Sequence, residues 1–179
     1  MKKKAKKDSL EGNRKKEWIT ADKVAKYGLL IALACVMGFV ESLIPVPIGI
    51  PGVKLGLANL VTIVSLYVVG VRGTLFVSIV RVLLTGVTFG GLSPMLYSMS
   101  GCLVSLLFMI LAKKLEIFSV RSISILGGIG HNIVQMVMAV LVLENLSLGY
   151  YFGVLMLSGM IAGMVVGLLG EMILKRFLR

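Results

Sequence analysis

Six polar side chains interrupt the apolar runs of this sequence, and their types are those that hold small molecules. They are Glu41, Asn59, Arg81, His131, Asn132 and Gln135. Arginine and glutamate supply charges, whereas histidine, asparagine and glutamine donate or accept hydrogen bonds. Because such groups are costly inside an apolar segment, each residue is a candidate for a binding site.

Helical spacing predicts that several of these side chains converge. Arg81 has threonines at i+4 and i+7, and His131 and Gln135 are spaced i, i+4. At about 1.5 Å per residue, Arg81 lies roughly 14 Å from Arg72, near the middle of a hydrocarbon core about 30 Å thick. The same rise per residue places the other five polar side chains either at the centre of that core or in the half of it that lies beyond Arg81 as seen from Arg72. The pattern predicts a polar cavity that opens toward one side.

A structural role is an equally good interpretation of each residue taken alone. Glu41 and Arg81 would then form a buried ion pair that orients two helices. His131 and Asn132 would satisfy backbone carbonyl groups beside the glycine-rich segment 127–130. The whole set on one side of the membrane is harder to explain in this way.

The composition indicates an integral membrane protein. Of 179 residues, 58% are hydrophobic and only 8 are Asp or Glu, which is too little polar surface for a soluble domain of this size. The net charge of +11 arises largely from a tail, because ten of the 19 Lys and Arg lie in residues 1–26. No groove-reading motif accompanies them, so we expect contact with the lipid bilayer and no nucleic acid.

The apolar runs predict an all-α, polytopic protein with six transmembrane helices. A basic cytoplasmic tail, 1–26, precedes a single domain, 27–179, with spans at approximately 27–44, 55–70, 74–89, 94–111, 122–143 and 149–174. Thr20 is the expected cap of the first helix, residues 71–73 form a turn, and Ser93 with Pro94 begins the fourth span. Positive charges cluster on one side, which predicts that both termini are cytoplasmic and that the proline-rich loop 45–54 covers the cavity from outside.

Several chemistries lack their residues. The only aspartates are Asp8 and Asp22, near the amino terminus, whereas a polyprenyl synthase needs paired aspartates to hold magnesium. One histidine and two cysteines on different spans do not make up the ligand set of a metal site. No phosphate-binding loop is present. We expect no enzymatic activity, no metal and no cofactor, so any powered transport requires a partner.

Small residues recur at helical spacing on two spans. Gly159, Gly163 and Gly167 form overlapping GxxxG steps on the last span, where packing within the chain is the favoured interpretation. On the first span the shared face consists of Ala21, Ala25, Gly28 and Ala32. Packing within the chain and docking to another chain are about equally favoured for that face.

Sequence motifs add a family resemblance over roughly residues 27–178. The motifs are Glu41-Ser-Leu-Ile-Pro45, the segment 51–59, Arg81-Val-Leu-Leu, Phe89-Gly-Gly, Gly130-His131-Asn132 and Leu157-Ser-Gly. Through them the chain resembles the Gx transporter family, also labelled heptaprenyl diphosphate synthase component I. That family is similar to the substrate-binding S components of energy-coupling factor (ECF) transporters, which hold a micronutrient in an outward-facing pocket of a six-helix bundle.

The resemblance implies a bacterial plasma-membrane subunit that captures a small ligand beneath loop 45–54. It implies an ECF coupling subunit and ATPases as partners, docked on the small face of the first span or on the Ala34-x3-Gly38 step. The alternative is a non-transporting subunit linked to isoprenoid or quinone metabolism or to flavin-based electron transfer. A self-contained carrier is a third hypothesis; the chain shows no second half or inverted repeat, which a dimer could supply.

Overall fold

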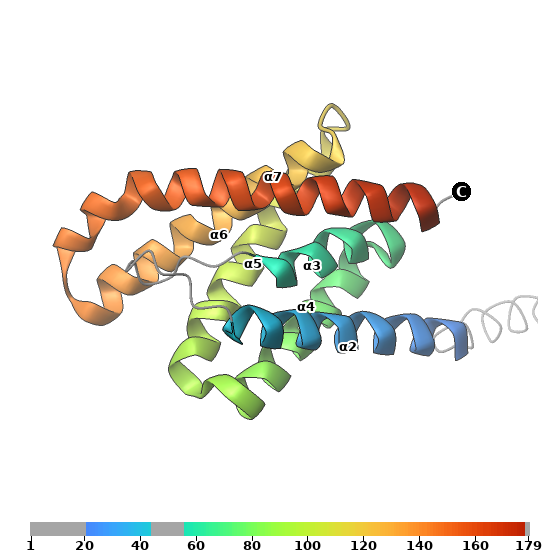
Figure 1. Ribbon diagram of the computed structural model, residues 1–179, viewed down its shortest axis with the longest axis horizontal. Coiled ribbons are helices and arrows are strands. Elements are labelled where there is room, and N and C mark those ends of the chain that lie inside the picture. Colours follow the sequence, from blue (N-terminus) through green and yellow to red (C-terminus); the bar gives the residue numbers. More distant parts are fainter. Residues whose placement is uncertain (1–20, 44–55, 178–179) are drawn as a thin grey trace, which may run out of the picture.

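The computed structural model describes residues 21–43 and 56–177. The expected Thr20 cap, most of the basic tail and the proline-rich loop 45–54 lie outside these residues. The described elements are helical and are joined by short connections (Figure 1). In chain order they are α2 (Ala21–Leu43), α3 (Leu57–Val68), α4 (Gly70–Thr85), the π-helix η2 (Gly86–Gly90), α5 (Leu92–Lys114), α6 (Val120–Leu143), the 3-10 helix η3 (Leu146–Tyr151) and α7 (Phe152–Phe177).

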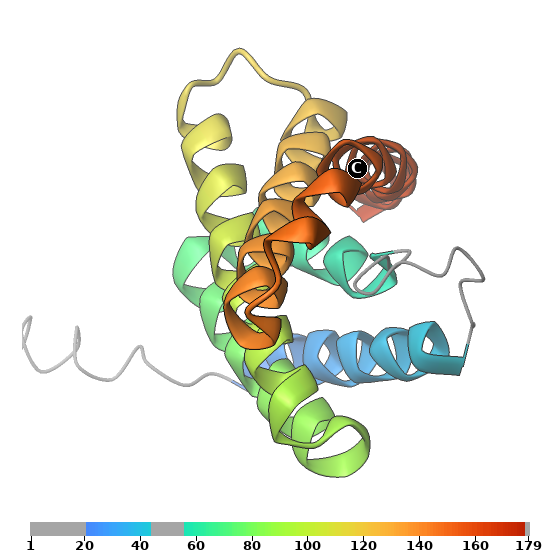
Figure 2. The ribbon, with the colours of Figure 1, turned by 90° about the vertical axis from the view of Figure 1, so that its left-hand side faces the viewer.

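The short helix α3 forms the centre of the bundle. Figures 1 and 2 both place it between α2 and α7. Ile63 and Leu66 pack with buried residues of α5, α6 and α7, and both have 0% exposure. On its other side Val61 packs with Leu30 of α2 and Val77 of α4. Because α3 contributes to both apolar clusters, it joins α2 and α4 on one side to α5, α6 and α7 on the other.

Helices α6 and α7 are in backbone contact along a line of glycines. A Cβ at Gly163 would lie 2.7 Å from Cα of Ile125, and one at Gly167 would lie 2.8 Å from Cα of Arg121. Glycine is required where two helix backbones approach so closely. The interpretation that the GxxxG steps pack within this chain is therefore confirmed for α7.

The structure corrects two of the expected helix starts. The turn lies at Val69, and Gly70, whose φ is 73°, already begins α4, so residues 71–73 are helical and do not form the turn. Helix α5 begins at Leu92 after Gly91, whose φ is 74°, so Ser93 is not the cap and Pro94 is the third helical residue. A glycine that can adopt positive φ ends the preceding helix in each case, which outweighs the weaker signal of the neighbouring serine or arginine.

Five of the described helical segments are long and apolar enough to cross a membrane. They are Ala21–Leu43, Gly70–Gly90, Leu92–Lys114, Val120–Leu143 and Leu146–Arg176. The predicted second span is the exception, because α3 has only 12 residues, or roughly 18 Å of helix. The chain is thus an all-helical, multi-pass membrane protein in which the central helix α3 is short.

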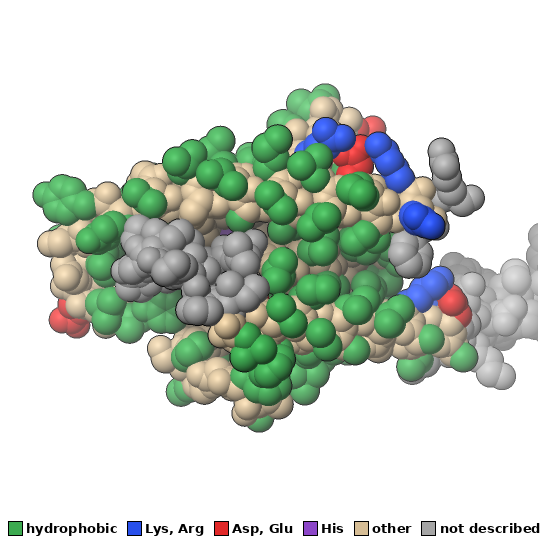
Figure 3. Space-filling model, in the orientation of Figure 1, with side chains coloured by type: hydrophobic (Ala, Val, Ile, Leu, Met, Phe, Trp, Pro, Cys, Tyr) green, Lys and Arg blue, Asp and Glu red, His purple; other side chains and the backbone are tan. Residues whose placement is uncertain are grey.

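Basic side chains gather at one end of the bundle, where α2 begins and α7 ends (Figure 3). This end includes Lys113 and Lys114 in the last turn of α5 and Lys175 and Arg176 in the last turn of α7. Arg121, near the start of α6, pairs with Glu171 of α7, which also accepts Lys175 Nζ at 2.7 Å. Lys113 Nζ donates to the carbonyl oxygen of Leu66 at 2.7 Å and so caps α3 at the same end.

Candidate functional site

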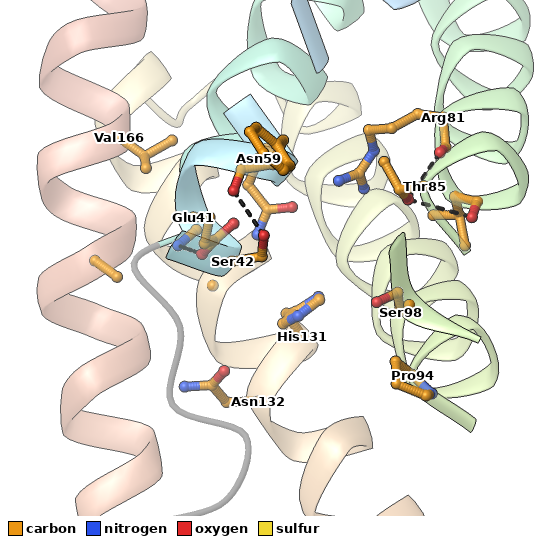
Figure 4. A pocket seen from close by; sticks show the side chains of 18 of the residues that line it. Glu41, Ser42, Asn59, Arg81, Thr85, Pro94, Ser98, His131, Asn132 and Val166 are labelled. Carbon is orange, nitrogen blue, oxygen red and sulfur yellow. Dashed lines mark hydrogen bonds between the residues drawn. The ribbon is translucent and has the colours of Figure 1, made fainter. Parts of the chain in front are cut away.

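A cavity of about 210 Å³ lies between the helices. It is formed by the end of α2, the start of α3, the second half of α4 with η2, the first turns of α5 and the middle of α6 and α7. Its polar lining consists of Glu41, Ser42, Asn59, Arg81, Thr85, Ser98, Ser124, His131 and Asn132. Figure 4 shows Glu41 to the left and Arg81 to the right, with His131 lower in the view. Five of the six predicted site residues are therefore together, although they come from four different helices.

Arg81 is the most unusual of these side chains, because it is a cation with only 8% exposure. Its Nη2 donates to Cys102 Sγ at 3.4 Å, and a thiol sulfur is a weak acceptor. Its Nε has no hydrogen-bond partner within the described residues. One turn later Thr85 donates its hydroxyl to the carbonyl oxygen of Arg81 at 2.9 Å, and so makes no hydrogen bond to the guanidinium. A buried charge with so few partners is costly, so Arg81 is suited to receive an anionic group.

Glu41 lies near the end of α2 and is engaged by the backbone of the next described segment. Its Oε1 accepts the N–H of Gly56 at 2.5 Å. Gly56 has a φ of 74° and precedes the first residue of α3, so the carboxylate fixes the place where α3 begins. No ion pair joins Glu41 to Arg81 in the described part of the chain. The buried pair considered from the sequence is therefore not formed.

Asn59 is in the first turn of α3, where its backbone N–H donates to the carbonyl oxygen of Gly56 at 2.8 Å. Its side chain lines the cavity near Glu41 (Figure 4). The placement of Glu41 and Asn59 thus depends on Gly56, whose N–H donates to the Glu41 carboxylate and whose carbonyl oxygen accepts the N–H of Asn59.

Asn132 lines the cavity and also ties α6 to α7. Its Nδ2 donates to the carbonyl oxygen of Leu155 at 2.6 Å and to Ser158 Oγ at 3.3 Å. The sequence left a carbonyl-satisfying role open for Asn132 beside segment 127–130, and the carbonyl that it contacts is that of Leu155 on α7. Gln135, by contrast, is not brought to the cavity. It is buried one turn farther along α6, with 4% exposure, and its Oε1 has no hydrogen-bond partner among the described residues.

His131 lies against a glycine of α5. A Cβ at Gly101 would be 2.7 Å from Cε1 and 2.8 Å from Nδ1 of the imidazole. Gly101, Ser98 and Cys102 are not among the site residues predicted from the sequence. The signal that identifies them is a stripe of small residues at helical spacing on α5, which continues to the buried Ser105.

We expect Gly101→Ala to displace the imidazole, since an added methyl group would overlap the ring. The chain has one histidine, so ¹⁵N-histidine labelling gives a single imidazole spin system. The variant should shift both ring-nitrogen resonances. Gly149→Ala is the matched control, because nothing lies within 4 Å of a Cβ at Gly149. Unchanged resonances in Gly101→Ala would contradict this packing.

The two small-residue steps of α2 face in opposite directions. Ala34 is 1% exposed and lies in the core that α2 shares with α3 and α4. A Cβ at Gly38 would lie 3.7 Å from Cγ2 of Thr85 on α4. The other face is exposed and consists of Ala21, Ala25, Gly28 and Ala32. Only this second face is open to another chain.

No group of three or more His, Cys, Asp or Glu side chains able to hold a metal ion occurs within the described ranges. Comparison with known proteins gives one finding. A family model described as heptaprenyl diphosphate synthase component I matches residues 30–173. No curated protein and no solved structure matches.

Proposed function

Since this chain belongs to the heptaprenyl diphosphate synthase component I family, also called the Gx transporter family, we propose that it is the ligand-binding membrane subunit of an uptake system for a small molecule. The observation that carries the proposal is Arg81, a buried cation that lines a cavity of about 210 Å³ and lacks a carboxylate partner among the described residues. Asn59 and His131 supply hydrogen bonds to the same ligand. Asn132 and Glu41 shape the wall.

The protein inserts with both termini in the cytoplasm of a bacterial cell. This orientation is supported by the basic end of the bundle, since Lys and Arg are retained on the cytoplasmic side. The cavity residues lie away from that end, so the ligand enters from outside. Loop 45–54, which the sequence predicts to cover the cavity, lies outside the described residues.

Transport is driven by a partner of the ECF type. Two observations support this part of the proposal. The sequence contains no phosphate-binding loop of its own. The α2 face of Ala21, Ala25, Gly28 and Ala32 is exposed and small, as close helix contact with a coupling subunit requires.

The protein itself is not an enzyme in this proposal, despite the family description. Asp22, the described aspartate, is exposed in the first turn of α2 and pairs with Lys26 at 2.8 Å. It does not line the cavity. Magnesium-dependent diphosphate chemistry would need paired carboxylates at the site, and Glu41 is the only acidic residue among the described lining residues.

A second candidate function follows from the description of the family. A prenyl diphosphate synthase component would act as a non-transporting subunit in isoprenoid or quinone metabolism or in flavin-based electron transfer. It would bind a soluble prenyl synthase or a redox protein at the cytoplasmic end and would need no ATPase.

Native mass spectrometry of the protein purified from its own membrane distinguishes the two functions. We expect a bound molecule small enough for the cavity, together with copies of an ATPase and a membrane coupling subunit. Recovery of a prenyl synthase or redox protein, with an empty cavity and no ATPase, would overturn uptake and favour the second candidate.

A further inference from the structure

The charge balance of the cavity limits what its ligand can be. Among the described lining residues, Arg81 is the only Lys or Arg and Glu41 is the only Asp or Glu. One positive and one negative side chain thus face the same small volume, and they do not pair with each other.

Both charges keep unused hydrogen-bonding capacity. The guanidinium has an Nε without a partner in the described chain and a single contact to a thiol sulfur. The carboxylate of Glu41 accepts one backbone N–H through Oε1. An ionised carboxylate has about four acceptor positions, so Glu41 can still accept from a cationic donor.

A ligand with one kind of charge would leave the opposite charge of the cavity uncompensated. An anion alone would bind Arg81 and would desolvate Glu41 at a cost, and a cation alone would do the reverse. A molecule that carries both charges compensates both walls. Such matching of opposite charges is how a low-dielectric site discriminates between ligands.

The size and the remaining lining define the body of this molecule. A volume of about 210 Å³ is below the roughly 300–1,000 Å³ typical of ligand pockets. Phe39 and Phe89 form a tilted ring pair with centroids 4.8 Å apart, and both line the cavity with Met95 and Val166. These groups favour a short apolar or aromatic body between the charged ends.

We propose that the ligand is a small zwitterion whose carboxylate or phosphate binds Arg81 and whose amino group or other basic nitrogen binds Glu41. This inference rests on the proposed uptake function and names its substrate class. It gives Glu41 a second role besides holding the N–H of Gly56.

Three series of probes with the same carbon chain test the inference. They are ω-amino acids of four to seven carbons, the corresponding monocarboxylates and the corresponding monoamines. Affinity is measured by isothermal titration calorimetry on the purified full-length protein in nanodiscs. We expect at least one ω-amino acid to bind at least about tenfold more tightly than its two singly charged analogues.

Glu41→Gln separates charge from structure, because the amide oxygen can still accept the N–H of Gly56. In this variant we expect the preference for the ω-amino acid to disappear and the affinity for the monocarboxylate to be unchanged or higher. A preserved preference in Glu41→Gln would overturn the inference. So would monocarboxylates that equal the ω-amino acids in the wild type, or the absence of binding by any ω-amino acid.

These outcomes are distinct from failure of the proposed function. A co-purified molecule without a basic nitrogen, found by native mass spectrometry together with the ATPase, would overturn the zwitterion and leave uptake intact. An empty cavity without an ATPase would overturn both.

Discussion

Arg81→Ala is expected to abolish ligand capture and to leave membrane insertion intact. Arg81 has only 8% exposure, and within the described chain no carboxylate pairs with it, so we expect the ligand to supply the missing anion. Removing one partner of a buried charge pair costs about 2–5 kcal/mol, which lowers affinity by a factor of about 30 to several thousand. The measurement is the amount of co-purified ligand per protein by mass spectrometry.

Insertion should survive this change because an arginine at the centre of a span opposes insertion by about 2.5–3.5 kcal/mol. Arg72→Ala is the matched control, since Arg72 lies on the same helix and is exposed at its first turn. It should retain the ligand. Arg81→Lys should bind more weakly than wild type, because lysine lacks the planar fork that holds an anion with two hydrogen bonds. Undiminished binding by Arg81→Ala would refute the site.

Gly28→Leu is expected to separate ligand binding from transport. Nothing lies within 4 Å of a Cβ at Gly28, so the chain itself accommodates a leucine there. A close helix–helix contact would not accommodate it. The variant should keep ligand affinity, lose the co-purified ATPase and reduce uptake into proteoliposomes by at least about tenfold, as a loss of roughly 1.4 kcal/mol in docking requires.

Gly153→Leu is the control for this second variant. Gly153 is also an exposed helical glycine, and nothing lies within 4 Å of the place that a Cβ would take there. Unlike Gly28, it lies near the start of α7. It should leave uptake and ATPase recovery unchanged. Equal effects of the two substitutions would show that bulk on the lipid-facing surface, and not docking on α2, limits transport.

The polar cavity could be predicted from the sequence because the residues that line it are polar or charged within otherwise apolar runs. Glu41, Asn59, Arg81, His131 and Asn132 each interrupt an apolar run, and helix rise alone places them at similar depth. Gln135 shared that signal, yet the cavity ends one turn before it. The end of a cavity depends on how neighbouring helices cross, which the periodicity of one helix does not contain.

The sequence also could not show which side chains on different helices form hydrogen bonds or ion pairs with one another. The sequence could not tell that Glu41 would accept the N–H of Gly56 and not pair with Arg81, since a contact between residues 15 apart depends on the segment that joins them. It also left open which small step of α2 faces outward. Burial of Ala34 against α3 and α4 decides that question.

The short central helix has a consequence for how the chain enters the bilayer. At roughly 18 Å, α3 cannot cross a hydrocarbon core of about 30 Å by itself. The segment after it, Gly70–Gly90, has the lowest mean hydropathy of the five candidate spans, 1.6, and carries Arg81. Neither is a good insertion signal alone, but the turn at Gly70 makes them a helical hairpin. We expect the translocon to release α3 and α4 into lipid as one unit, after which α5–α7 enclose the arginine.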